Sequence, residues 1–222
     1  MYSCNYIKEK IVVDGKLDES IWQTAEIINL KIPVTNDIPE SKTEVRLLWD
    51  NKYLYVGFKA YDKDIWSYYT EHDSKTFTED CLEIFIQPDI DKPDYYNFEI
   101  NALGTVYDAY SKVRNAGGED CHRWSKWNCN DLKVGINIEG TINDYSDIDS
   151  YWILECAIPF KSLPSLNNKK PNSGDIWKFH VARYDYSIYL EKSDGKELSS
   201  NATLSKVDFH NVDEWEKIVF IR

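Results

Sequence analysis

The fold is decided by residues 77–91, which read FTEDCLEIFIQPDID, and by residues 95–102, which read YYNFEINA. Successive side chains of a strand point to opposite faces, so apolar residues at every second position mark a face turned toward a core. Both segments show this pattern, at Leu82, Ile84, Ile86, Phe98 and Ile100. The intervening turn, DIDKPD, predicts that the two strands pair in antiparallel fashion.

Comparable patterns recur along the chain. Further strands are predicted at 44–50, 53–62, 105–111, 131–140, 150–159, 175–186 and 214–221. The first two form a hairpin signal through Asn51 and Lys52. Short helical turns are expected at 18–25, where Asp18 would cap, and at 159–163. Two segments read as long loops, 112–130 and 187–206.

No strand alternates with a sustained amphipathic helix, which argues against a parallel α/β sheet. No low-complexity linker or internal repeat divides the chain. We therefore expect residues 1–222 to form one all-β domain, an antiparallel β-sandwich of immunoglobulin-like or jelly-roll-like type with a few short helical turns. Val56 should lie in the core with the apolar residues of the two central strands.

Charge excludes several partners. The formal net charge is −12, and so acidic a surface repels phosphate backbones and anionic lipid. The sequence contains no run of about 18 apolar residues, the length needed to span a membrane. The first ten residues hold no apolar stretch that could act as a signal peptide, so we expect a cytoplasmic protein or one whose leader has been removed. Cys81 and Cys156 lie in apolar strand contexts and should be buried thiols, which favours a reducing compartment.

The non-core face of the two central strands is unusually polar. Its expected members are Glu83, Gln87, Asn97, Glu99 and Asn101, with Phe77 and Tyr95 nearby. A solvated sheet face is also polar, but repeated Asn is depleted in strands. Two interpretations stay open here: an ordinary solvated face, or a shallow site that binds a ligand on an open face.

A catalytic interpretation requires two carboxylates about 5–9 Å apart, one with a raised pKa. Glu83 and Glu99 on neighbouring strands could meet that distance, although 38 acidic residues make many such pairs by chance. No nucleophile elbow, zinc-protease, P-loop or dinucleotide motif is present. A small β-sandwich glycoside hydrolase or lyase using this pair remains the alternative function.

Two metal patterns were weighed. Cys121, His122 and Cys129 match no zinc spacing, which favours a loop with incidental thiols. Three aspartates could offer oxygen ligands to Ca²⁺ or belong to a solvated turn: Asp89, Asp91 and Asp94. Glu155 and Arg183 interrupt apolar runs, so we expect them to pair or to be held by other polar groups.

An ordered set of motifs carries a resemblance over nearly the whole chain. The motifs are VDGKLDESIWQTA, TEVRLLWDNKYLYVGFKAYDKDI, EDCLEIFIQPDID, YYNFEINALGT, WILECAIPF and WKFHVARYD. Together they resemble the family 9 carbohydrate-binding modules and family 9-like proteins. The resemblance implies a β-sandwich that binds sugars, often at a chain's reducing end, appended to or associated with glycan-degrading enzymes. It also implies a structural calcium ion.

The resemblance assigns site residues one by one. Phe77 stands where binding members hold the first of two sugar-sandwiching Trp rings, and Glu83 is the Glu of the EIF motif. Glu99 and Asn101 stand where the family has Arg-x-Asn, so the Asn matches and the Arg does not. Asn201 stands where the second Trp is expected, and Trp124 or Trp127 would replace that ring.

The resemblance therefore implies non-catalytic binding of a neutral mono- or oligosaccharide, with no cofactor required. Glu83 and Asn101 would hydrogen-bond sugar hydroxyls, and aromatic faces would stack on the ring. A haem-carrying sandwich ranks last, because the only Met is Met1.

Overall fold

The computed structural model describes residues 1–112 and 127–222. Its strands are β1 (Tyr2–Tyr6), β2 (Ile28–Asn29), β3 (Thr43–Trp49), β4 (Tyr53–Tyr61), β5 (Cys81–Gln87), β6 (Tyr95–Asn101), β7 (Val106–Ser111), β8 (Lys133–Glu139), β9 (Tyr151–Pro159), β10 (Ile176–Tyr186), β11 (Lys196–Ser200) and β12 (Glu216–Ile221). Short 3-10 turns lie between them: η1 (Ser20–Thr24), η2 (Thr76–Thr78), η4 (Phe160–Ser162), η5 (Pro164–Leu166) and η6 (Val212–Glu214).

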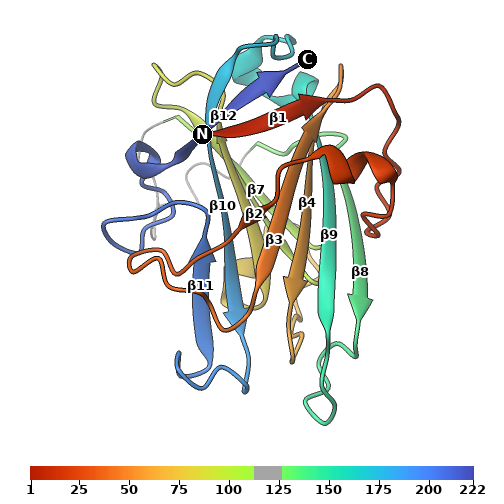
Figure 1. Cartoon of the computed structure of the whole chain (residues 1–222), viewed down its shortest axis with the longest axis vertical. Coiled ribbons are helices and arrows are strands. Elements are labelled where there is room, and N and C mark those ends of the chain that lie inside the picture. The colour runs from red at the N-terminus through yellow and green to blue at the C-terminus, as the bar shows by residue number, and fades with distance from the viewer. Residues whose placement is uncertain (113–126) are drawn as a thin grey trace.

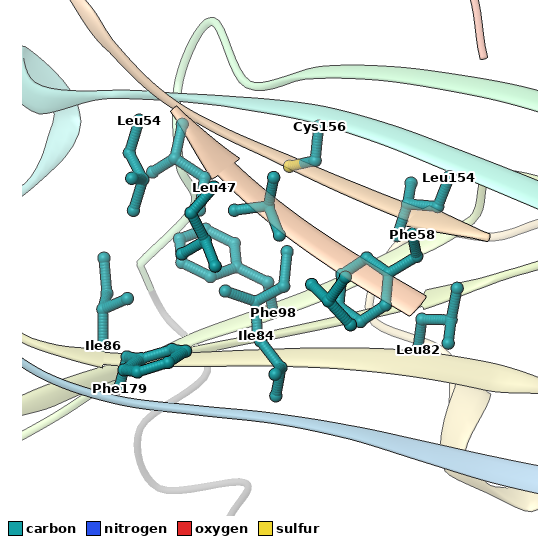
Figure 2. Close-up of a cluster of buried hydrophobic side chains, with 14 of the residues drawn as sticks. Leu47, Leu54, Phe58, Leu82, Ile84, Ile86, Phe98, Leu154, Cys156 and Phe179 are labelled. Atoms are coloured by element: carbon teal, nitrogen blue, oxygen red, sulfur yellow. The ribbon is translucent and has the colours of Figure 1, made fainter. Parts of the chain in front are cut away.

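The described strands form one continuous sheet in the order β7-β6-β5-β10-β12-β1-β3-β4-β9-β8, with β11 paired to β10 and β2 to β3. The sheet curls over, so that the half containing β5, β6 and β10 faces the half containing β3, β4 and β9 (Figures 1 and 2). The result is the predicted β-sandwich. One feature departs from a purely antiparallel sheet: β1 runs parallel to both of its neighbours, β12 and β3.

Every strand predicted from sequence is present, with ends shifted by one or two residues. Three strands were not predicted, namely β1, β2 and β11, and the last lies inside a segment expected to be a loop. The expected cap by Asp18 is wrong, because Glu19 holds the cap position of η1 and makes no side-chain capping bond. Within the described residues, no helix has the length and apolar composition needed to cross a membrane.

The core lies between the two halves of the sheet. All six predicted core residues are at most 1% exposed: Val56, Leu82, Ile84, Ile86, Phe98 and Ile100. Figure 2 shows side chains of β5, β6 and β10 meeting those of β3, β4 and β9 in this layer. Cys81 and Cys156 are fully buried, as predicted. Apolar alternation along the strands therefore builds a dry interior.

Glu155 fastens the N-terminal segment to the sheet. Its carboxylate accepts the backbone N–H groups of Asp14 and Gly15 at 3.0 and 2.9 Å and the indole N–H of Trp22 at 3.0 Å. Gly15 has φ +84°, and a Cβ there would lie 2.5 Å from the carbonyl carbon of Ile136. Only glycine therefore allows this close approach to β8.

Arg183 is buried among acids. Its Nη2 lies 2.6 Å from Asp62 Oδ2 and 3.2 Å from Asp185 Oδ1. Its Nη1 donates to the Tyr61 carbonyl at 2.8 Å and to Thr43 Oγ1 at 3.2 Å. Glu155 and Arg183 are thus held by other polar groups, the second of the two arrangements expected from sequence.

Candidate functional site

The sheet register brings the predicted polar residues onto one face. Glu83 lies opposite Glu99 on β6, and β10 adds further members from the other side of β5. We call this surface the polar face, and it comprises Cys81, Glu83, Phe85, Gln87, Tyr95, Asn97, Glu99, Asn101, His180, Ala182 and Tyr184. The prediction that Glu83, Gln87, Asn97, Glu99 and Asn101 share a face is confirmed.

The expectation of an open, shallow face is wrong. Glu83 is 3% exposed and Glu99 4%. Apolar residues of the segment 201–215 pack against Phe85, Tyr95 and Ala182, and they are Ala202, Leu204, Phe209, Val212 and Trp215. The Trp215 ring, for example, lies 5.3 Å from that of Phe85. The polar face is therefore an interior surface, covered in part by an irregular segment.

Glu83 and Glu99 form a buried acid pair. One carboxylate oxygen of Glu83, one of Glu99 and the sulfur of Cys81 all lie within 4.8 Å of one another. Glu99 accepts hydrogen bonds from Asn97 Nδ2 at 2.8 Å and Thr76 Oγ1 at 3.4 Å. Loss of hydration raises the pKa of Glu99 to about 7. Loss of hydration, followed by repulsion from Glu99, raises the pKa of Glu83 well above its ordinary value.

Several buried polar atoms on this face have no hydrogen-bond partner within the described residues. They are Glu83 Oε2, Gln87 Oε1, Asn97 Oδ1 and both ring nitrogens of His180. Leaving one such group unpaired costs about 1–3 kcal/mol. So many on one face mark a surface whose hydrogen-bonding capacity is unused, and a bound ligand is one explanation.

Aromatic rings flank the acid pair. Phe77 in η2 is partly buried, and its ring centroid lies 6.4 Å from that of Tyr184. Tyr186 fixes this region by donating its hydroxyl to the Phe77 carbonyl at 2.9 Å. Burial, then the charges of Glu83 and Glu99, raise the pKa of Tyr184 above its ordinary value.

The sequence analysis does not predict Tyr184 as a site residue, although the alternation of β10 contains the signal. His180, Ala182 and Tyr184 occupy every second position of that strand. The register pairs Ala182 with Glu83 and Tyr184 with Cys81, which places all three on the polar face. The pairing of β10 with β5 could not be read from sequence, because 88 residues separate the two strands along the chain.

Asn101 does not serve as a free ligand contact. Its Nδ2 donates to the Tyr69 carbonyl at 2.8 Å and to Glu79 Oε1 at 2.5 Å. Its Oδ1 accepts the backbone N–H groups of Leu103 and Thr105. All of its hydrogen-bonding groups are therefore used to fasten the turn after β6 to the loop before β5.

Asn201 and Trp127 also differ from the roles expected of them. Asn201 accepts the Val181 N–H at 2.9 Å through its side chain and donates its backbone N–H to the Val181 carbonyl at 3.1 Å, so it continues the pairing of β11 with β10. Trp127 packs on the core side of β6, where its ring lies 5.0 Å from Tyr96 and 6.1 Å from Phe98. It therefore cannot replace a ring on the polar face. Trp124 lies outside the described residues, as do Cys121 and His122 of the weighed zinc pattern.

The aspartates weighed as calcium ligands do not fit a metal site. Asp89 pairs with Lys92 at 2.9 Å, and Asp94 accepts the Tyr110 hydroxyl at 3.0 Å. Asp91 is exposed, and the acid clusters found in the described residues lie elsewhere. One of those clusters joins Asp62, Asp80 and Asp185 around the Arg183 guanidinium, where a positive charge is already supplied.

Comparisons with known proteins agree with this geometry. The family model described as "Carbohydrate family 9 binding domain-like" matches residues 13–221. Endo-1,4-beta-xylanase A of Thermotoga maritima is 38% identical over 176 residues, which cover 77% of this chain. The curated relatives are far longer, and the chain spans only 12–13% of the length of the first three.

Solved structures share the fold. A family 9 carbohydrate-binding module from Caldicellulosiruptor kristjanssonii in complex with cellotriose aligns with a TM-score of 0.66 and 17% identity, covering 99% of this chain and 93% of that chain. A family 9 carbohydrate-binding module from the same organism in complex with glucose aligns with a TM-score of 0.64 and 17% identity, covering 99% of this chain and 96% of that chain.

Proposed function

We propose, from the premise that this chain belongs to the carbohydrate family 9 binding domain-like proteins, that its polar face binds a neutral sugar without cleaving it. The observation that carries the proposal is the set of buried polar atoms without partners, above all Glu83 Oε2 and Asn97 Oδ1. Sugar hydroxyls both donate and accept hydrogen bonds, so they suit this mixed set of carboxyl, amide and imidazole groups.

The rings beside the acid pair support the same ligand. Phe77 and Tyr184 are partly buried, whereas the acids are almost fully covered. A sugar ring that stacks on an aromatic face buries its C–H groups and directs its hydroxyls sideways. We place the ring against Phe77 and Tyr184, with hydroxyls directed to Glu83. Access would require the covering segment 201–215 to shift, since Phe209 packs 5.6 Å from Tyr184.

The electrostatics favour binding over cleavage. A retaining glycosidase needs one ionised carboxylate as nucleophile and a second, protonated carboxyl as acid. Burial raises the pKa of both Glu83 and Glu99, and no cation contributes to either shift. Hydrogen bonds from Asn97 and Thr76 favour the ionised form of Glu99, but burial outweighs them, so the pKa of each carboxyl is shifted toward the protonated form. A pair that retains protons serves as hydrogen-bond donor and acceptor.

Calorimetry with cellotriose and with glucose tests the proposal on three proteins: wild type, Glu83→Gln and Glu83→Leu. Gln keeps a neutral hydrogen-bonding group of similar size, so its affinity should stay within about threefold of wild type. Leu leaves a ligand hydroxyl unpaired, which should weaken binding by about tenfold. Glu139→Gln, at the exposed end of β8, is the control.

Unchanged binding by Glu83→Leu would disprove the site. New reducing ends released from cellotriose by wild type would disprove the non-catalytic role. Equal loss in Gln and Leu would instead show that Glu83 acts as an ionised carboxylate.

We further propose that the chain acts beside a glycan-degrading enzyme, which is supported by its similarity to a part of longer xylanases. Linking it to a xylanase catalytic domain should raise hydrolysis of insoluble xylan and leave hydrolysis of soluble xylan unchanged. An equal effect on both substrates would contradict this role.

A further inference from the structure

A second, chemically different pocket lies at the end of the sandwich where β4 begins and β9 ends. Its volume is about 640 Å³, within the roughly 300–1,000 Å³ typical of ligand sites. We call it the basic pocket, and the lining residues that matter here are Lys52, Tyr53, Lys161, Asn168, Lys169 and Lys170. No acidic residue lines it, although the whole chain carries a net charge of −12.

Local structure explains how these cations gather. Lys52 sits at the tip of the β3–β4 hairpin and Lys161 in the turn after β9. Asn167 and Asn168 adopt left-handed backbone conformations with φ +50° and +60°, which reverse the chain ahead of Lys169 and Lys170. Asn tolerates this region better than other non-glycine residues.

The charges are only partly compensated. Lys161 pairs with Asp131 at 2.7 Å, and Lys170 Nζ donates to Asn51 Oδ1 at 2.8 Å. The ammonium groups of Lys52 and Lys169 make no ion pair within the described residues. Asp50 lies beside Lys52, but its Oδ1 accepts the backbone N–H groups of Lys52 and Tyr53 in the hairpin turn.

The four lysines that line the pocket outnumber the two aspartates beside it, Asp50 and Asp131. Salt screens charges beyond about 8–10 Å at physiological ionic strength, so a ligand in the pocket responds chiefly to its own walls. Lys133 adds a further ammonium, 4.8 Å from the Tyr53 ring. The pocket is therefore a positive region on an otherwise acidic protein.

The remaining groups indicate what kind of anion fits. Tyr53 is partly buried and presents an aromatic side chain, and asparagine amides line the pocket beside it. An aromatic ring with amides is the combination that contacts sugar faces and hydroxyls. Four lysines and no arginine line the pocket, so it offers separate point charges and no planar bidentate clamp, which suits carboxylates spaced along a saccharide chain. We propose that the basic pocket binds a carboxylate-bearing saccharide, a chain of uronic acids, independently of the polar face.

The test is calorimetry with trigalacturonate and, in parallel, cellotriose, at 50 and 500 mM NaCl. Lys52→Gln/Lys169→Gln removes two unpaired charges and keeps a polar side chain that is one atom shorter. The control, Lys63→Gln/Lys217→Gln, makes the same change of charge in the loop after β4 and on β12. Trigalacturonate should bind wild type and the control alike, about five- to tenfold more weakly to the pocket variant, and more weakly at high salt. Cellotriose binding should not change in either variant.

Three results would overturn the proposal: no binding of trigalacturonate, equal loss in pocket variant and control, or equal affinity for a triglutamate peptide of the same charge. The last result would show that the pocket recognises the charge of the ligand and not its sugar rings. Loss of cellotriose binding in Glu83→Leu with trigalacturonate binding retained would show that the two sites are separate, so either proposal can fail without the other.

Discussion

Replacing Arg183 by Met should cause a large loss of stability. The guanidinium is 1% exposed and makes contacts with four groups, two of them carboxylates at 2.6 and 3.2 Å. Met fills much of the same volume but leaves the acids Asp62, Asp80 and Asp185 buried together with no cation. Removing one partner of a buried ion pair typically costs 3–5 kcal/mol, because the other charge is left uncompensated.

A loss of about 3–5 kcal/mol is a large part of the 5–15 kcal/mol available to a typical domain. For a chain of this size each kcal/mol lowers the melting temperature by about 2–4 °C, so the variant should melt roughly 6–20 °C below wild type. The measurement is urea and thermal unfolding followed by tryptophan fluorescence. Burial raises the pKa of Asp62 to about 7, so this acid is largely neutral at pH 5. The loss should therefore be smaller at pH 5 than at pH 8.

Arg46→Met is the matched control. Arg46 pairs with Glu44 at 3.3 Å in a partly buried position, and Lys42 also pairs with Glu44, so removing Arg46 leaves no acid without a cation and should cost about 0–1 kcal/mol. A loss in Arg183→Met no larger than in Arg46→Met would refute the reasoning that the guanidinium neutralises a buried acid cluster. A large loss of stability in Arg183→Met that does not depend on pH would show instead that the guanidinium stabilises the fold by packing and not by charge.

Three further predictions follow from the site. The pKa of Glu99, raised to about 7 from 4.5, means that the folded protein holds this proton more tightly than the unfolded chain does. Its contribution to stability is present below pH 4.5 and is lost as the pH rises through 7. The free energy of unfolding in urea should therefore fall less between pH 4.5 and 8 in Glu99→Gln than in wild type. A steeper fall in the variant would contradict the assignment. Tyr184→Ala should weaken cellotriose binding by about five- to tenfold while Tyr184→Phe stays near wild type, and calorimetry that ranks the two variants equally would exclude ring stacking. Because Asp89, Asp91 and Asp94 do not converge, 1 mM CaCl₂ or EDTA should move the melting temperature by less than about 2 °C, and a calcium-dependent rise of 5 °C would reverse that conclusion.

The strands of the sandwich could be predicted from the sequence where apolar and polar residues alternate. β5 and β6 were predictable for that reason, and their register followed from the turn between them. β11 was missed because KELSS holds a single apolar residue, Leu198, although this strand pairs with the preceding strand β10. β1 was missed although YSCNY alternates, with Tyr2, Cys4 and Tyr6 packed in or against the core, because five residues form too short a pattern and both of its partners, β12 and β3, lie far along the chain.

The candidate site was predictable only in part. Alternation placed Glu83 and Glu99 on one face, but it says nothing of what covers that face. The cover comes from residues 201–215, whose apolar side chains follow no strand or helix period. The role of Asn101 likewise depends on a loop that lies some thirty residues earlier, because it binds the Tyr69 carbonyl. Contacts between segments of irregular structure decide both points.

The position of β1 between β12 and β3 has a consequence for biosynthesis. Residues 2–6 are synthesised before every other described strand, yet one of their two neighbours is the last strand described, Glu216–Ile221. At about 5–20 residues per second, β1 waits roughly 10–40 s for that partner. During this time its free edge exposes unpaired N–H and C=O groups, which can recruit strands of other nascent chains. The strand order therefore makes the free edge of β1 a site of possible aggregation during translation.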